Sequence, residues 1–328
     1  MRGRVVAVHG RHFLVEDDTG ICECVTRGKK GGVACGDQVT FEITSAGKGV
    51  IESIEPRHNL LYRSDEFRSK LLAANIDQAA IVVAAVPAFN EELLIRCLVA
   101  CEVAEIPALI VLNKADLPET EALARALAPY AELGYPLLLV SAKEEVAMAE
   151  PLRVPAYVEG SSQSTAEPLR VPPYQEGSPR GLLAELDQCL SDKTTVFVGA
   201  SGVGKSTLLN RLVPDANATT GEISLALDAG KHTTTHARLF HLPASGGALI
   251  DSPGMQEFGL KHLNLASLMA AFPEIHSRHG QCRFYNCRHL KEPGCAVLEA
   301  AKDGAIMANR MKVYHWLLAG LVKTNQGS

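Results

Sequence analysis

The order of two short motifs constrains this chain more than any other feature of its sequence. Residues 199–206 read Gly-Ala-Ser-Gly-Val-Gly-Lys-Ser, which matches the pattern of a phosphate-binding loop. The tetrapeptide Asn113-Lys-Ala-Asp116, typical of a loop that recognises guanine, precedes that loop instead of following it. Both motifs come directly after apolar runs that predict buried parallel strands. The order therefore predicts a circularly permuted α/β domain.

The phosphate-binding loop has the context that its chemistry requires. A strand predicted over residues 194–198 leads into it, and a helix predicted over residues 205–212 leads out. Glycines let backbone N–H groups turn toward phosphate oxygens, and the helix N-terminus adds a favourable dipole. Lys205 is expected to reach the β- and γ-phosphates. The predicted nucleotide contacts in this loop are Gly199, Ala200, Ser201, Gly202, Val203, Gly204, Lys205, Ser206 and Thr207.

A carboxylate at the end of a strand can select guanine over adenine. Asp116 can accept hydrogen bonds from the N1–H and the exocyclic amine of guanine, and adenine lacks that pair of donors. The motif follows a predicted strand, at the edge of a parallel sheet where ligands bind. A Ser-Ala-Lys triplet after the next strand is expected to close over the base. The predicted base contacts are Asn113, Lys114, Ala115, Asp116, Ser141, Ala142 and Lys143.

A third motif, Asp251-Ser-Pro-Gly254, predicts the magnesium and γ-phosphate side of the site. Asp251 is expected to hold Mg²⁺ through water, and the Gly254 N–H to contact the γ-phosphate. One hydroxyl of the triplet 233–235 should complete the metal shell; we take Thr234, and its two neighbours stay open. The predicted magnesium ligands are Ser206, Thr234 and Asp251.

The residue that orients the hydrolytic water is less directly indicated. Met255 follows Gly254, where many GTPases carry Gln, and an apolar side chain cannot orient a water molecule. His232 is the candidate, Gln256 competes with it, and a cation from a partner is a further alternative. The predicted catalytic residues are His232, Lys205 and Gly254.

A compact group of soft ligands near the C-terminus predicts a structural zinc site. Three thiols and one imidazole suit tetrahedral Zn²⁺, and the metal would supply folding free energy to a loop with little core. The ligands are Cys282, Cys287, His289 and Cys295. The pairs Cys22/Cys24 and Cys97/Cys101 have no such setting and are predicted to be core residues.

Changes of pattern along the chain predict three domains. Five short strands within the first 60 residues favour an OB-fold β-barrel over residues 1–69. Alternating strands and helices over 70–262 predict the permuted domain, interrupted by a mobile insertion at 144–179 that contains a near-duplicate heptapeptide. Residues 263–328 form the predicted zinc-binding module with helices.

Charge and composition limit the partners and the cellular compartment that can be predicted. The chain of 328 residues has a net charge of −5, yet residues 261–328 hold nine Lys or Arg against four Asp or Glu. This local excess, with the basic loop 27–32, favours contact with RNA backbones. Nine cysteines, no leader and no long apolar run predict a cytoplasmic protein without membrane contact. A monomer is expected.

The arrangement resembles the RsgA (YjeQ/EngC) family of small-ribosomal-subunit biogenesis GTPases over nearly the whole chain. The phosphate loop, His232-Thr-Thr-Thr, Asp-Ser-Pro-Gly with Glu257-Phe-Gly-Leu, and the Cys/His spacing carry the resemblance. It implies an N-terminal OB-fold, a structural zinc, GTP hydrolysis stimulated by the 30S subunit, and late 30S maturation with 16S rRNA as a contact. It also supports His232, because the family's proposed catalytic His stands there. The long insertion, and Gln256 where a basic residue is common, depart from the family.

Two other readings stay open. Met255 is compatible with a GTP-dependent RNA-binding switch that hydrolyses GTP negligibly. An unrelated P-loop ATPase or kinase is disfavoured by Asp116.

Overall fold

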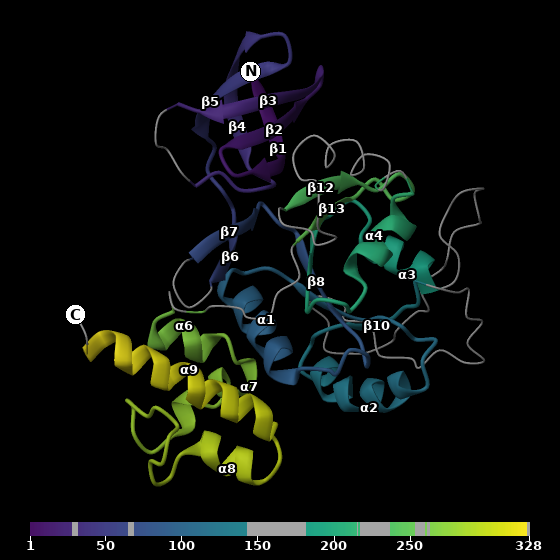
Figure 1. The fold of residues 1–328 in the computed structure, drawn as a ribbon. Helices are drawn as coiled ribbons and strands as arrows, with labels where there is room; N and C mark the ends of the chain where they lie inside the picture. Colours follow the sequence, from purple (N-terminus) through teal and green to yellow (C-terminus); the bar gives the residue numbers. More distant parts are fainter. Residues whose placement is uncertain are drawn as a thin grey trace. The chain divides into compact units, whose positions relative to one another are not determined.

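The computed structural model describes residues 1–27, 32–64, 69–142, 182–214, 216, 237–252, 260 and 263–326. The elements are labelled in Figure 1. The chain packs into two compact units, which are described separately below. The first comprises Met1–Leu61, Leu71–Phe89 and Pro107–Gln256, and the second Tyr62–Lys70, Asn90–Ile106 and Glu257–Ser328.

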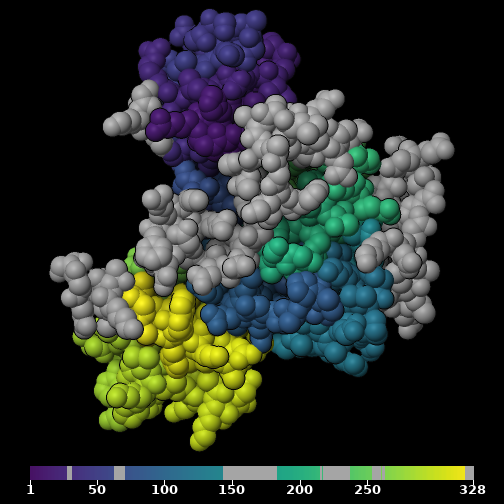
Figure 2. All heavy atoms as spheres, in the orientation of Figure 1, coloured from purple at the N-terminus to yellow at the C-terminus, as the bar shows by residue number. Residues whose placement is uncertain are grey.

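A closed five-stranded barrel begins the first unit, and its strands are rich in β-branched residues or alternate apolar with polar residues. Its strands are β1 (Arg2–His9), β2 (His12–Asp17), β3 (Gly20–Thr26), β4 (Gln38–Ser45) and β5 (Lys48–Ile54). They pair in the order β1-β2-β3-β5-β4, and a further β1–β4 pairing closes the barrel. The barrel residues form one rounded, purple body in Figure 2. Cys22 and Cys24 lie in the barrel core, as predicted.

A mainly parallel sheet forms the rest of the first unit. Its strands are β8 (Gln78–Val83), β9 (Ala108–Leu112), β10 (Leu137–Leu139), β11 (Thr194–Val198), β12 (Arg238–His241) and β13 (Ala248–Asp251). The order is β10-β9-β8-β11-β13-β12, with only β12 antiparallel to its neighbour in this list. Helices α2 (Glu119–Glu132), α3 (Leu182–Cys189) and α4 (Lys205–Leu212) connect these strands. The chain therefore builds an ordinary nucleotide-binding sheet from strands in a permuted sequence order.

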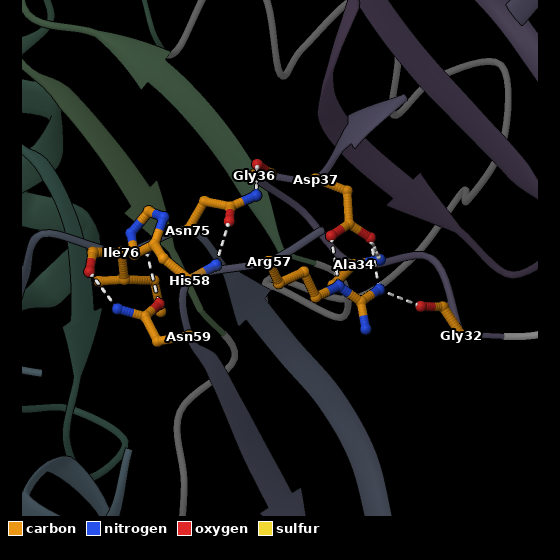
Figure 3. Close-up of polar contacts among 9 residues, drawn as sticks. All are labelled: Gly32, Ala34, Gly36, Asp37, Arg57, His58, Asn59, Asn75 and Ile76. Atoms are coloured by element: carbon orange, nitrogen blue, oxygen red, sulfur yellow. Dashed lines mark hydrogen bonds and ion pairs between the residues drawn. The ribbon is translucent and has the colours of Figure 1, made fainter. Parts of the chain in front are cut away.

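Backbone pairing and polar side chains join the barrel to this sheet. Barrel strand β1 pairs with β12 through Ala7 and Arg238. Gly36 approaches the chain after the barrel so closely that a Cβ there would lie 2.2 Å from the Ala74 carbonyl oxygen. The Arg4 guanidinium of β1 donates to the Thr194 hydroxyl of β11 at 2.7 Å. Within the barrel segment, Figure 3 shows the Arg57 guanidinium, after β5, against the Asp37 carboxylate, before β4, with Nε–Oδ1 and Nη2–Oδ2 distances of 2.6 Å. The barrel is thus bonded to the sheet as well as tethered to it.

Two asparagines extend the same polar junction. The Asn59 amide donates to the Ile76 carbonyl at 2.7 Å, and its oxygen accepts from the Ile76 N–H at 2.8 Å (Figure 3). Asn75 adopts a positive φ of 55°, donates to the Gly36 carbonyl at 3.0 Å and accepts from the His58 N–H at 3.2 Å. These side chains satisfy backbone groups where the chain leaves the barrel and no regular strand pairing is available.

The second unit is helical. It contains α1 (Glu91–Val103), α6 (Leu265–Ala270), α7 (Pro273–His276), η1 (His279–Gln281), α8 (Ala296–Lys302) and α9 (Ala308–Gln326). Helix α1, capped by Asn90, packs against α6 and α9 and buries Cys97 and Cys101, as predicted. A buried ion pair joins Arg310 to Glu274. Strands β6 (Leu60–Ser64) and β7 (Ser69–Ala74) form a separate small sheet.

Within the described ranges, none of the helices combines the length and apolar character needed to cross a bilayer.

Candidate functional site

The phosphate-binding loop leaves the fully buried strand β11 and ends at the first residue of α4. Gly199 has φ 145°, and a Cβ there would lie 2.2 Å from the Val82 carbonyl oxygen. Gly204 has φ 100°, and a Cβ there would lie 2.2 Å from Asn113 Nδ2. Neither position can accept a side chain without moving its neighbour, so the sequence pattern reflects a steric requirement.

Lys205 lies inside this loop. Its side chain is buried, and Nζ donates to the carbonyl oxygens of Gly199 and Ala200 at 2.9 Å each. The next residue, Ser206, is exposed at the start of α4. The loop therefore presents an ammonium, a hydroxyl and a helix N-terminus together, which is a suitable arrangement for a polyphosphate.

The predicted guanine motif is bonded directly to the phosphate loop. Asn113 is buried after β9, and its Nδ2 donates to the Val203 carbonyl at 2.9 Å. Lys114, at φ 64°, donates from Nζ to Gly202 at 2.9 Å and to Val86 at 2.6 Å. Two motifs far apart in the sequence thus form one continuous surface.

The carboxylate predicted to read the base has a fixed orientation. The Ser141 hydroxyl, from the loop after β10, donates to Asp116 Oδ1 at 2.7 Å. Asp116 is half-buried, and Ser141 and Ala142 are buried. The Ala115 N–H donates to the Val140 carbonyl at 3.0 Å, which holds the two base-facing loops together. Lys143 lies outside the described residues.

Asp251 ends β13, beside the phosphate loop. It is buried and aligns with Phe197 on the neighbouring strand β11. The Ser252 hydroxyl donates to the Phe197 carbonyl at 2.5 Å, so the start of this motif is anchored to β11. The other residues predicted for the magnesium and γ-phosphate side lie outside the described residues. They are His232, the triplet 233–235, Gly254, Met255 and Gln256.

The predicted zinc ligands meet in the second unit. One donor atom from each of Cys282, Cys287, His289 and Cys295 lies within 4.8 Å of all the others. The Cys282 and Cys295 sulfurs are 3.8 Å apart, and His289 Nδ1 lies 3.6 Å and 3.3 Å from them. Tetrahedral zinc with Zn–S bonds of about 2.3 Å places sulfurs roughly 3.8 Å apart. The donor set and its spacing therefore fit zinc.

Burial shapes the protonation of these ligands. It raises the pKa of the Cys287 thiol to about 12 and raises the pKa of Cys295, while it lowers the pKa of His289. The imidazole is therefore neutral, as a metal ligand must be. A bound cation would supply the charge that buried thiolates need.

Sequence patterns did not indicate every contact in the nucleotide site. The Val86 carbonyl, after β8, was missed because a backbone acceptor has no residue-type signature. Thr120, whose buried hydroxyl donates to the Lys114 carbonyl at 2.8 Å, was also missed. Only their position in the sequence could have indicated these contacts. The parallel strands β8, β9 and β11 end at the same edge of the sheet, so the residues that follow each strand lie near one another.

Comparison with known proteins agrees with this geometry. Residues 54–154 and 167–261 match the family RsgA GTPase. The small ribosomal subunit biogenesis GTPase RsgA of Paraburkholderia phymatum is 48% identical over 97% of this chain and 91% of the relative. The crystal structure of YloQ, a circularly permuted GTPase, aligns with TM-score 0.65 and 28% identity over 98% of this chain and 95% of that one.

YjeQ from Thermotoga maritima aligns with TM-score 0.67 and 27% identity, covering 98% of each chain. The predicted fold class is confirmed. It combines an N-terminal barrel, a permuted nucleotide-binding domain and a C-terminal module with a Cys/His site. The predicted enzyme class, a GTP hydrolase, is confirmed too. The family match covers more than half of the chain, and the alignment with the Paraburkholderia phymatum relative covers 97% of it. The chain therefore belongs to the RsgA GTPase family.

Proposed function

We propose that this GTPase binds the small (30S) ribosomal subunit and acts in its late maturation. It hydrolyses GTP to GDP and phosphate, and the subunit stimulates that reaction. The observation that carries the proposal is the bonding of the guanine motif to the phosphate loop through Asn113 and Lys114. The name of the Paraburkholderia phymatum relative supports the ribosomal role.

The residues present fit a guanine nucleotide. Asn113 Oδ1 is buried and has no hydrogen-bond partner among the described residues. Lys205 Nζ donates to two carbonyl oxygens of the loop, positions that phosphate oxygens could take. We assign the base to Asn113–Asp116 and Ser141–Lys143, and the phosphates to Gly199–Thr207. Ser206, Thr234 and Asp251 would hold Mg²⁺, which neutralises the charge that develops on the phosphates.

Catalysis then needs a positioned water and stabilised phosphate charge. Lys205 would stabilise charge on the β- and γ-phosphates, and the Gly254 N–H would hold the γ-phosphate. His232 would orient the water, since Met255 cannot. The ribosomal subunit would raise the rate by adding a cation that stabilises the charge of the transition state.

The remaining proposals concern partners and metal. Cys282, Cys287, His289 and Cys295 would bind one structural Zn²⁺, supported by their spacing. The 16S rRNA would be the direct contact within the subunit, supported by the basic C-terminal residues. The protein would act as a monomer in the cytoplasm, and the three-domain division at residues 69/70 and 262/263 stays a prediction.

Single-turnover hydrolysis tests the enzyme and its partner together. GTP hydrolysis by the full chain is measured alone, with purified 30S subunits, and with 50S subunits as the control. Stimulation by 30S subunits only is the expected result. No stimulation by 30S would contradict the proposal.

The competing function is a GTP-dependent RNA-binding switch with negligible hydrolysis, with which Met255 is compatible. It predicts 30S binding that depends on GTP while the hydrolysis rate stays at its basal value with subunits present. His232→Ala separates the two readings, because only the hydrolase loses stimulated turnover while it keeps GTP affinity.

A further inference from the structure

Large apolar side chains project into solvent from the loop that carries the metal ligands. Tyr285 is 94% exposed, Leu290 is 47% exposed and Phe284 is 40% exposed. The three residues lie within seven positions of one another. Several large apolar side chains exposed close together in one loop mark an interaction surface more often than a single exposed residue does.

The loop that presents these side chains is held in place by its own hydrogen bonds. The Arg283 N–H donates to the Gly294 carbonyl at 2.9 Å, and the Cys287 N–H donates to the Phe284 carbonyl at 3.2 Å. From outside the loop, the Tyr314 hydroxyl donates to the Arg288 carbonyl at 3.1 Å. A side chain on a braced loop loses little conformational freedom on binding, so it is suited to make a contact.

The charge beside the exposed ring is cationic. Arg283, Arg288 and Lys291 are all exposed. Glu292 is the one acidic residue between positions 282 and 295. Its carboxylate accepts from the backbone N–H groups of Arg288, Leu290 and Lys291 at 2.8–3.0 Å. Because that anion serves the loop's own backbone, the cations remain available to an external anion.

We propose that this loop, residues 283–291, binds single-stranded RNA, with an unpaired base stacked on Tyr285. The inference rests on the proposed ribosomal function and adds the site and the kind of RNA. An exposed aromatic ring beside Arg and Lys matches the stacking platforms and basic tracks that bind unpaired nucleotides. A duplex would engage the cations and leave the ring unused, because its bases are already stacked.

The test measures RNA affinity of the zinc-loaded full chain by fluorescence anisotropy. The probes are a labelled single strand of about ten nucleotides, within the usual span of such sites, and its duplex. Tyr285→Ala should weaken single-strand binding roughly tenfold, within the range that loss of one base stack produces. Tyr285→Phe should retain the affinity, because the ring remains.

Two matched variants separate stacking from other effects. Ile21→Ala removes a side chain that is 57% exposed on the barrel, and it should leave the affinity unchanged. Arg283→Gln should weaken single strand and duplex alike and lower the salt dependence by about one phosphate contact. Zinc content and melting temperature are measured for each variant. If Tyr285→Ala loses zinc, Tyr285→Leu, which also lacks the ring, takes its place.

The outcomes separate this inference from the proposed function. If Tyr285→Ala and the parent bind the single strand equally well and 30S-stimulated hydrolysis is intact, the stacking proposal is wrong. The proposed ribosomal role is then unaffected. Absence of 30S stimulation in the parent removes the ribosomal role itself. Binding to an acidic peptide or to anionic vesicles, lost in Tyr285→Ala while RNA affinity is kept, would assign the surface to another partner.

Discussion

At the scale of single residues, the phosphate loop depends on a glycine, Gly204, that contacts the base-reading motif. At Gly204 a Cβ would lie 2.2 Å from Asn113 Nδ2, in a backbone conformation that L-residues avoid. Gly204→Ala should therefore weaken GTP binding by about tenfold or more, equivalent to about 1.4 kcal/mol of overpacking. Binding of a fluorescent GTP analogue measures the change.

A matched glycine controls for backbone strain alone. Gly134 also has a positive φ, of 97°, but a Cβ there meets nothing within 4 Å. Gly134→Ala should reduce stability slightly and leave GTP affinity unchanged. If both variants bound GTP equally well, the steric account of Gly204 would be wrong.

Base selection is the second property that single residues decide. Asp116→Asn replaces a carboxylate, which only accepts hydrogen bonds, with an amide that has an NH₂ donor and a carbonyl acceptor. The NH₂ group complements the carbonyl that xanthine carries in place of the exocyclic amine of guanine. The variant should lose affinity for GTP and gain affinity for xanthosine triphosphate.

Ser141→Ala removes one hydrogen bond to Asp116. It should weaken GTP binding only about fivefold, or about 1 kcal/mol. Competition binding with GTP, ATP and xanthosine triphosphate tests both, and an unchanged preference in Asp116→Asn would refute the assignment.

The sequence was sufficient to place these residues together but not to describe their contacts. Glycines at fixed spacing and a strand-ending Asp have strong residue-type signatures, so both loops were predictable. The donation of Lys114 to the Val86 carbonyl had none, because any residue can supply a backbone oxygen. The residues that would act on water, including His232, stay predictions.

At the scale of elements, a buried ion pair ties the start of β4 to the chain that follows β5. Asp37 is fully buried, Arg57 is 21% exposed, and they form two hydrogen bonds of 2.6 Å. Arg57→Ala would leave a buried carboxylate without its cation, so unfolding free energy should fall by about 3–5 kcal/mol. Urea unfolding followed by circular dichroism measures this change.

An exposed pair on the same barrel provides the control. Arg2 lies 3.0 Å from Glu55 but its side chain is 82% exposed. Arg2→Ala removes the same charge and should cost less than about 1 kcal/mol. Similar losses of unfolding free energy in the two variants would show that burial adds nothing to the contribution of the Asp37–Arg57 pair.

Regular elements were predicted well, and short or fully buried ones less so. All five barrel strands were expected, because each is rich in β-branched residues or alternates apolar with polar residues between turns. Strand β12, of four residues, was missed because its length gives no clear periodicity. Helix α1 lies in the stretch where alternating strands and helices were predicted, but eight of its 13 residues are buried. Its pattern therefore could not indicate that α1 packs with α6 and α9.

At the scale of the whole molecule, the two proposed ligands belong to different units. Every described residue that we assign to the nucleotide lies in the first unit, and all four metal ligands lie in the second. The permutation accounts for this division, because the strand that ends in Asp251 is the last of the sheet and the chain then continues into the second unit. Each ligand should therefore stabilise its own unit.

Removal of the metal tests this independence. Cys287 is buried among the metal ligands, and Cys287→Ser should reduce bound zinc from one ion per chain to none. Because structural zinc supplies about 10–16 kcal/mol to small zinc domains, the second unit should unfold at a lower temperature. GTP affinity should stay within about twofold, since a factor of two is only about 0.4 kcal/mol.

The control is Cys189→Ser, which replaces a half-buried free cysteine in the first unit and should retain zinc. Zinc is measured by elemental analysis of protein purified without chelator, and unfolding by calorimetry with and without GDP. GDP should raise only the transition of the first unit, because a ligand stabilises the state that binds it. Zinc-free parent protein would contradict the metal assignment, whereas a parallel loss of GTP affinity in Cys287→Ser would show that the units depend on each other.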